Sequence, residues 1–252
     1  MDRVIIRSTV QLVKFEFRQI TRIFPNMFFS AFFPLLLLLV FGSLYGNEPS
    51  EEFYGFGTID ILTPSYVGMI IAVNSLVHLP LSVSFYRELK VLKRFMATPI
   101  NPIQVLISQY VVYFIISVLS SAILIAMSFA VFGLEFHGKP LYFALYFVVS
   151  SLSMSAIGFF ITSLTSKTKT CSAISNFIYF PMIFLSGASF ATELMPPNME
   201  YISKFIPLTY SVNLLKESWI GNISMDHRTN IFLLLGIFVV FIAASTITFK
   251  WE

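Results

Sequence analysis

Six stretches of this sequence contain no Asp, Glu, Lys or Arg, and each is long enough to cross a membrane as a helix. About 20 apolar residues in helical conformation span the roughly 30 Å of hydrocarbon in a bilayer. These stretches do not alternate polar and apolar residues with a period of two, which argues against an outer-membrane barrel. They therefore predict an all-α integral membrane protein with six transmembrane helices. The charge-free stretches are residues 23–47, 61–86, 95–134, 140–166, 170–192 and 229–249.

Nothing in the sequence divides the chain, so we expect a single transmembrane domain over residues 1–252. Only 12% of the residues are charged, whereas about 25% is usual in soluble domains. The first apolar stretch is not expected to be a cleavable signal, because its basic leader is over 20 residues long and no small-x-small site follows. The lone cysteine, Cys171, excludes an intramolecular disulfide and a Cys-based zinc site. The expected spans are Asn26–Tyr45, Pro64–Phe85, Ile103–Phe132, Leu141–Leu164, Ser172–Phe190 and Asn230–Phe249.

The placement of Lys and Arg predicts how the helices are oriented, because cytoplasmic loops are enriched in these residues. If the N-terminus is cytoplasmic, six spans return the C-terminus to the same side, and 12 of the 16 basic residues fall there. The loop 46–60, on the opposite side, has four acidic residues and no basic one. We therefore expect both termini in the cytoplasm. The net charge of +3 follows from this bias and does not indicate a nucleic-acid partner.

Residues 1–25 precede the first span and are expected to form an amphipathic helix. Apolar residues recur there at steps of three and four, with basic residues on an adjacent stripe. Such a helix lies in the inner membrane interface with its basic side chains toward anionic head groups. The alternative is a basic flank that only fixes the topology. The apolar stripe is Ile6, Val10, Val13, Phe17, Ile20 and Phe24, and the basic stripe is Arg3, Arg7, Lys14, Arg18 and Arg22.

The cytoplasmic stretch "FYRELKVLKRFMATPINP", residues 85–102, combines charges with regularly spaced apolar residues. Its apolar residues Leu89, Leu92, Phe95 and Met96 share one helix face. The run stops at Thr98, because Pro99 disfavours helix in the residue before it. The pattern predicts a short helix over 86–98 that can dock in a groove of a soluble partner. The alternative is a positively charged topology loop with no partner.

Residues 191–229 are too polar to span a membrane and too apolar for an ordinary loop. Prolines at 196, 197 and 207 break this segment, and Gly221 is expected to cap its second helix. Two short re-entrant helices in the outer interface fit this pattern. The apolar stripe of the second helix is Leu208, Val212, Leu215 and Trp219.

The sequence contains one ionisable candidate inside a predicted span, His78. An intramembrane ionisable residue is a functional hypothesis by default, although a neutral imidazole bonded to a neighbouring helix is the structural alternative. No HExxH, GxSxG or paired intramembrane carboxylates occur. No GxxxxGK[ST] motif occurs either, so a transport ATPase would have to be another polypeptide. We expect no cofactor bound by this chain.

Two motifs, in this order, resemble those of the permease subunits of type-2 ABC exporters. The first is "YRELKVLKRFMATPINP", a basic stretch with a leucine-containing helix followed by Thr-Pro and a second Pro. It departs at Lys90 and Phe95, where the family more usually has Gly and Leu. The second is "FLSGASF" at 184–190 followed by "IPLTYSVNLLKE" at 206–217. The matching residues are Arg87, Leu92, Lys93, Arg94, Ala97, Thr98, Pro99 and Pro102 of the first motif, and Pro207, Leu208, Thr209 and Tyr210 of the re-entrant segment.

The resemblance implies a coupling helix over 86–99 that inserts into a separate ATPase subunit, beside a connecting helix over 1–25. Two permease chains, as a homodimer or heterodimer, would work with two ATPase chains that hold ATP and Mg. The implied coupling residues are Arg87, Glu88, Leu89, Leu92, Lys93, Arg94, Phe95, Met96 and Pro99.

The resemblance also implies that spans two and five line the substrate path, although packing against lipid is an equal explanation of their aromatic residues. We expect export of an amphipathic compound (an antibiotic, peptide or lipid) across a bacterial cytoplasmic membrane. The alternatives are export of a lipid-linked polysaccharide, a membrane scaffold, and an ion-coupled secondary transporter, which is disfavoured because no span contains an acid. The implied path residues are Tyr66, Met69, Asn74, His78, Asn176, Phe177, Tyr179, Phe180 and Met182.

Overall fold

The computed structural model describes most of the predicted spans and part of the segments between them. The described residues are 11, 13, 14, 16–18, 28–50, 53, 55–91, 102–190, 196–221 and 226–248.

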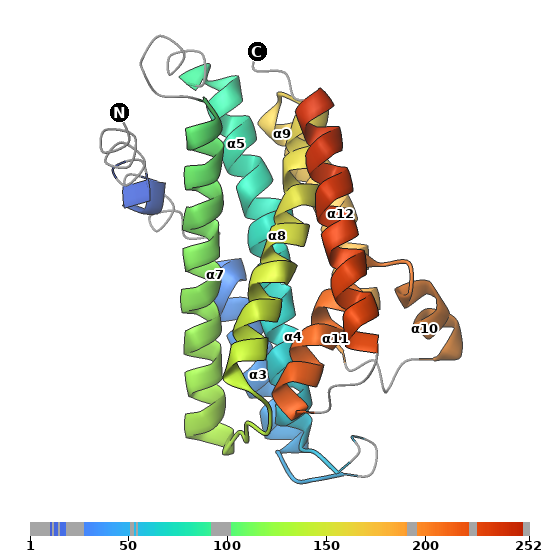
Figure 1. The fold of residues 1–252 in the computed structure, drawn as a ribbon. Coiled ribbons are helices and arrows are strands. Elements are labelled where there is room, and N and C mark those ends of the chain that lie inside the picture. The colour runs from blue at the N-terminus through green and yellow to red at the C-terminus, as the bar shows by residue number, and fades with distance from the viewer. Residues whose placement is uncertain are drawn as a thin grey trace.

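The described part of the chain is almost wholly helical, in agreement with the prediction (Figure 1). Two short π-helical turns, η1 and η3, continue directly into the α-helices beside them, so η1–α3 and α4–η3–α5 are each one continuous rod. The helices are η1 (Phe28–Phe32), α3 (Phe33–Tyr45), α4 (Thr58–Val73), η3 (Asn74–His78), α5 (Leu79–Glu88), α7 (Pro102–Phe132), α8 (Pro140–Leu164), α9 (Thr168–Leu185), α10 (Pro197–Ser203), α11 (Pro207–Ile220) and α12 (Asp226–Thr248).

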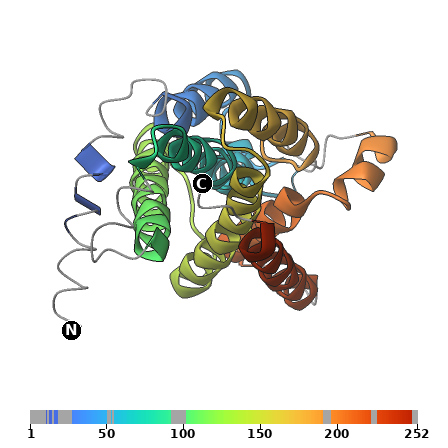
Figure 2. The same cartoon turned by 90° about the horizontal axis from the view of Figure 1, so that it is seen from above.

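The long helices lie side by side and define two ends of the molecule. We call the end that carries Glu88 and Thr168 the upper end, as drawn in Figure 1. The lower end carries the segment that follows α3 and the connection between α7 and α8. Viewed from above, α5 and α8 lie near the centre, with α7, α9 and α12 arranged around them (Figure 2).

Five helices within the described residues are long and apolar enough to cross a membrane. They correspond to five of the six predicted spans, and α7 and α8 match their predicted limits to within one residue. The remaining predicted span, 172–190, corresponds to α9, which begins four residues earlier, ends at Leu185 and is not among the five. The count of six therefore stays a prediction. The five are Phe28–Tyr45, Thr58–Glu88, Ile103–Phe132, Pro140–Leu164 and His227–Thr248.

The rod α4–η3–α5 forms the centre of the protein. Every residue of α4 is buried, and α4 packs on α3, α7 and α11. Its helix begins at Thr58, six residues before the predicted start at Pro64, and this proline is accommodated inside the helix. Because α4 has no lipid-facing side, its mostly apolar character follows from burial on all sides. Its polar residues, including the acid Asp60 in its first turn, are buried as well.

Backbone contact fixes the rod against α8. A Cβ added at Gly158 of α8 would lie 2.1 Å from the carbonyl oxygen of Ser75 in η3, so no side chain separates the two helices there. The Ser75 and Ser155 hydroxyls are also 3.0 Å apart. Small residues allow such close approach between helices in membranes. In contrast, a Cβ at Gly236 of α12 would meet nothing within 4 Å among the described residues.

The segment before α12 contains two short helices, as predicted. The stripe on α11 is buried against the core, and α11 ends at Gly221 in the left-handed conformation (φ 82°), as expected for a glycine at this position. Trp219 donates from Nε1 to the Glu135 carbonyl oxygen, 3.1 Å away, and so ties α11 to the lower end. A position of these helices in the membrane interface stays a prediction.

Candidate functional site

A cavity of about 290 Å³ lies between η1–α3, the η3–α5 part of the central rod, and α9. Seven Phe or Tyr side chains contribute to its wall, and no charged residue occurs among its described lining residues. The family resemblance implied a path along spans two and five, and four of the implied path residues meet here. They are His78, Asn176, Tyr179 and Phe180.

His78 is one of the lining residues of this cavity. Its side chain is 5% exposed, and Nε2 has no hydrogen-bond partner within the described part of the chain. Its ring stacks on Tyr113 of α7, with centroids 6.4 Å apart and planes inclined by 16°. A buried polar atom without a partner is uncommon, because its desolvation is not compensated. Because Nε2 itself is buried, a bound molecule reaches it only after the imidazole ring or its neighbours move.

Asn176 lies on the facing helix, α9. Its Nδ2 donates to the Ser172 carbonyl oxygen at 2.8 Å and to the Ser172 hydroxyl at 3.3 Å, which are bonds within its own helix. Local bonds of this kind leave the amide oxygen available as an acceptor. Ser172 lines the same cavity. The cavity thus combines an aromatic wall with a small set of polar groups.

The other predicted path residues lie elsewhere. Tyr66, Met69 and Met182 are buried in the core, and Phe177 is 81% exposed. Asn74 joins three helices, because its oxygen accepts from Ser30 (2.7 Å) and its Nδ2 donates to Ser117 (3.0 Å). None of these five is among the lining residues of the cavity, so the sequence predicted the two helices better than the individual side chains.

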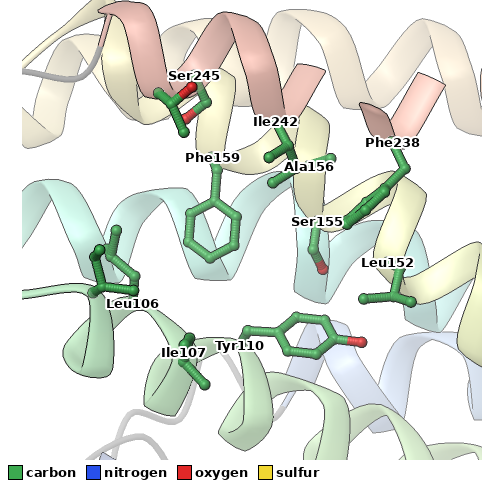
Figure 3. Close-up of a pocket in the computed structure, with 12 residues that line it drawn as sticks. Leu106, Ile107, Tyr110, Leu152, Ser155, Ala156, Phe159, Phe238, Ile242 and Ser245 are labelled. Atoms are coloured by element: carbon green, nitrogen blue, oxygen red, sulfur yellow. The ribbon is translucent and has the colours of Figure 1, made fainter. Parts of the chain in front are cut away.

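A larger cavity, of about 450 Å³, lies between α7, α8 and α12 (Figure 3). It shares no lining residue with the first cavity and contains none of the predicted path residues. Tyr110, Ser155 and Phe159 are on its wall, and Ser245 lies near its upper end (Figure 3). Its walls come from helices that also expose apolar residues on other faces.

The predicted coupling segment lies at the upper end and is described only in part. The expected single helix over 86–98 is wrong at its start, because α5 ends at Glu88 and Lys90 has a left-handed φ of 56°. An α-helix cannot continue through that conformation. Six predicted coupling residues lie outside the described residues. They are Leu92, Lys93, Arg94, Phe95, Met96 and Pro99.

Arg87 is one of the implied coupling residues, but its side chain lies inside this chain, at 5% exposure. Its Nη1 donates to the carbonyl oxygens of Thr162 (2.6 Å) and Thr165 (3.1 Å) at the end of α8. The next residue, Glu88, accepts from the Thr168 backbone N–H (2.9 Å) at the start of α9. Leu89 is exposed. In this arrangement the guanidinium group is occupied by α8.

The predicted re-entrant residues form the junction between α10 and α11. Pro207 is the first residue of α11, where a missing N–H does no harm. Leu208 is fully buried, and Thr209 donates from its hydroxyl to the Ser203 carbonyl oxygen at 2.7 Å. The Tyr210 hydroxyl donates to the Lys204 carbonyl oxygen. These contacts give the Pro-Leu-Thr-Tyr stretch a structural role.

Glu16 is a buried acid that the sequence did not single out. It belongs to the segment before the first span and is 1% exposed, whereas its neighbours Lys14 and Arg18 are exposed. Burial raises the pKa of its carboxyl group, and hydrogen bonding to Tyr86 of α5 and the side chain of Gln109 of α7 lowers it less strongly. The only sequence feature that distinguishes Glu16 is that it is an acid inside a basic, amphipathic stretch, and this feature does not indicate that its side chain is buried.

The segment that carries Glu16 also packs through apolar residues. Val13 and Phe17 contact a buried cluster from α5 and α7, in agreement with the predicted apolar stripe. Glu16 is not among the lining residues of either cavity. Its burial therefore belongs to the docking of this segment rather than to the cavities.

A family model described as "ABC-2 type transporter" matches residues 7–220 of the chain. The chain is 26% identical over 166 residues to "Probable multidrug ABC transporter permease YbhR" of Escherichia coli (strain K12), covering 66% of this chain and 45% of that protein. It is 24% identical over 193 residues to "Probable multidrug ABC transporter permease YbhS" of the same strain, covering 75% and 51%.

A third relative is matched over more of its length. The chain is 22% identical over 210 residues to "Inner membrane transport permease YadH" of Escherichia coli (strain K12), covering 83% of this chain and 79% of that protein. By contrast, the chain spans about half the length of the two multidrug permeases that it matches.

Proposed function

The chain belongs to the ABC-2 type transporter family as a permease subunit, and we propose that it forms the membrane path of an ATP-driven exporter of amphipathic compounds. The observation that carries this proposal is the cavity between η1–α3, η3–α5 and α9. Its aromatic wall and few polar groups suit a substrate with an apolar body and hydrogen-bonding groups.

The lining of this cavity also guides the choice between substrate classes. A glycan buried there would need many hydrogen-bond partners, because each hydroxyl left unpaired costs free energy. The wall offers His78, Asn176, Ser172 and Ser189 beside the larger set of aromatic and aliphatic side chains. This composition favours an amphipathic compound over a lipid-linked polysaccharide.

We propose that energy comes from a separate ATPase subunit, in two copies, which holds ATP and Mg. The sequence has no phosphate-binding motif of its own. A second permease chain would complete the transport path, as in the family. The ATPase would contact the segment after α5, which is basic and carries regularly spaced apolar residues.

We further propose that α9 is the sixth span, that both termini lie in the cytoplasm, and that the protein occupies a bacterial cytoplasmic membrane. With 18 residues, α9 is about 27 Å long at 1.5 Å per residue, slightly less than the thickness of the hydrocarbon. The upper end would then face the ATPase. The basic residues of the 85–102 stretch, together with Lys167 and Lys169, support this orientation.

Co-purification followed by ATPase measurements tests the proposal. The permease is purified in mild detergent together with the ATPase that it binds, and the complex is reconstituted in nanodiscs. We expect ATPase activity that increases with rhodamine 6G, a lipophilic aromatic dye, and does not increase with a soluble oligosaccharide. A complex that responds only to the oligosaccharide would contradict the substrate class.

Two substitutions in the 85–102 stretch test the partner. Changing Leu92 and Phe95 together to Asp should release the ATPase and leave the spans inserted, because each buried apolar side chain contributes roughly 1.5–3 kcal/mol to such a contact. The matched control changes Ile103 and Ile107, exposed on α7, to Ser. If the double Asp variant still retains a stoichiometric ATPase and transports, the coupling role of this stretch is wrong.

A further inference from the structure

Two consecutive residues at the end of α5 contact two different helix ends. Arg87 donates to the carbonyl oxygens of Thr162 and Thr165, and Glu88 accepts from the backbone N–H of Thr168. We call this pair of contacts the double cap. Only three residues, 165–167, separate α8 from α9, so the double cap holds both sides of one tight turn.

Each charge of the double cap has the sign that its helix end favours. The last carbonyl groups of a helix lack partners and form the negative end of its dipole, and the first N–H groups form the positive end. The Arg87 guanidinium group therefore suits the end of α8, and the Glu88 carboxylate suits the start of α9. Charge-assisted hydrogen bonds of this kind are stronger than neutral ones.

The double cap lies immediately before a change in chain direction. The Leu89 N–H bonds to the Phe85 carbonyl oxygen, and the Lys90 N–H bonds to the Arg87 carbonyl oxygen at 2.9 Å. Lys90 then takes the left-handed conformation that ends the helix. Arg87 and Glu88 are thus the last side chains of the central rod before the segment assigned to the ATPase contact.

On its other side, the double cap reaches a wall of the cavity. The Thr168 N–H that Glu88 binds belongs to the first turn of α9. Along the same helix, Ser172, Asn176, Tyr179 and Ile183 line the cavity at steps of three or four residues. A helix transmits displacement along its axis, because every turn is hydrogen-bonded to the next. Displacement of the first turn of α9 therefore moves this wall.

We infer that Arg87 and Glu88 are positioning residues that fasten the start of α9 to the segment following α5, so that nucleotide-driven movement of that segment reshapes the cavity. This inference rests on the proposed function. It assigns Arg87 an intramolecular role in place of a contact with the partner. It also makes the turn 165–167 a part of the transmission path, which no sequence motif indicated.

The test exchanges the two charges, in the double variant R87E/E88R. The exchange keeps the composition and net charge but places each charge at the helix end that repels it. An environment-sensitive fluorophore at Ala173→Cys, an exposed position on α9, reports the response of α9 when a non-hydrolysable ATP analogue binds the ATPase. The native Cys171 is fully buried, and the parent without Ala173→Cys measures any labelling there.

We expect the analogue to shift the fluorescence of the wild-type complex. In R87E/E88R this shift should be smaller by about fivefold or more, because fivefold is near the lower limit of the coupling usually measured between two sites. Co-purification and analogue binding should be unchanged. The variants Arg87→Lys and Glu88→Asp keep both charges and should restore much of the shift. The control exchange, E200K/K204E, reverses an exposed ion pair between Glu200 of α10 and Lys204, which follows α10, and should have no effect.

The outcomes separate the inference from the proposed function. If the wild-type chain binds no ATPase, or the analogue shifts no fluorescence in its complex, the proposed function fails. If the wild type responds and R87E/E88R responds equally, the positioning role is wrong. If R87E/E88R does not fold, the single variant Glu88→Gln replaces it in the test, because it removes only one charge, from an exposed side chain. A fluorescence shift in Glu88→Gln equal to that of the wild type would then also overturn the inference.

Discussion

The imidazole ring of His78 stacks on the phenol ring of Tyr113, with their centroids 6.4 Å apart, and this contact orients His78 beside the cavity. Stacking fixes the ring plane and leaves Nε2 without a partner among the described residues. Substitution can therefore separate the stacking of the ring from the hydrogen-bonding capacity of Nε2.

Changing His78 to Phe keeps an aromatic ring on Tyr113 and removes the polar nitrogen. We expect rhodamine 6G to stimulate the ATPase at a higher half-maximal concentration, by about two- to tenfold, because one hydrogen bond contributes roughly 0.5–1.5 kcal/mol. Dose–response curves of the reconstituted complex measure this shift. His78→Leu, which also loses the stacking, should additionally lower the thermal midpoint. If the dose–response curves for several dyes are unchanged, His78 contributes only to packing and does not bind the substrate.

The buried carboxyl group of Glu16 makes docking of the N-terminal segment depend on pH. Because burial raises its pKa above the ordinary value of 4.5, the docked state binds the proton more tightly than the undocked state does. Docking is therefore strongest below about pH 4.5 and weakens as the pH rises through the raised pKa. The groups that face Glu16 from α5 and α7 are Tyr86, Gln109 and Tyr113.

A nitroxide label at Lys14→Cys, an exposed position, measures this effect. We expect its mobility to increase between pH 5 and pH 9 in the otherwise wild-type chain. Glu16→Gln cannot ionise and should remove the pH dependence while keeping the label immobile. Equal pH profiles in both proteins would show that Glu16 does not control docking.

Lys90 has a left-handed φ of 56°, although lysine carries a Cβ. This conformation costs such a residue roughly 1–2 kcal/mol, and glycine avoids the cost at the expense of a more flexible unfolded chain. We expect Lys90→Gly to stabilise the protein by about 0.5–1 kcal/mol. Thermal unfolding in detergent measures the change. Leu89→Gly, at a right-handed position, should be destabilising, and the opposite ranking would contradict the assigned turn.

Gly158 and Gly236 provide a matched pair of helical glycines. Alanine at Gly158 would press its Cβ on the Ser75 carbonyl oxygen, and the overpacking should cost at least about 1–3 kcal/mol. Alanine at Gly236 meets open space among the described residues and should stabilise α12 by up to about 1 kcal/mol. Fluorescence size-exclusion chromatography after heating compares the two variants. Similar thermal midpoints would mean that α8 and η3 are less closely packed than described.

The proposed orientation predicts which end of the molecule an external reagent reaches. Cysteine at Glu48, an exposed position at the lower end, should react with a membrane-impermeant maleimide in intact cells. Cysteine at Lys167, at the upper end, should react only after the cells are opened. The parent protein controls for labelling of the buried Cys171. The reverse pattern would invert the proposed orientation and move the ATPase contact to the other end.

The sequence predicted the helices whose limits depend on local chemistry. Charge-free stretches and an initial proline were enough for α7 and α8, and the glycine cap was enough for the end of α11. The start of α9 was missed because Thr168 and Lys169 look like loop residues. Their helical conformation is supported by Glu88, which is 80 positions away in the sequence.

For the candidate site, too, the sequence indicated the helices but not the contacts that depend on residues distant in the sequence. The resemblance to type-2 ABC permeases indicated the two helices that bear the cavity, whose lining includes the polar residues His78 and Asn176. It did not distinguish the lining residues from Tyr66 or Met69, because rotation of a helix about its axis is set by its neighbours. The exposed basic appearance of Arg87 was misleading for the same reason, since its partners are carbonyl groups at the end of α8.

The direct contact of Gly158 with Ser75 has a mechanical consequence for the cavity. Where two backbones touch, there is no layer of side chains that could change rotamers to let the helices slide past each other. The Ser75–Ser155 contact beside it opposes sliding as well. The η3 wall of the cavity is thus immobilised on α8, and both move as one rigid body. Any change in the volume around His78 then comes from α9 or from η1–α3, the walls outside that rigid body.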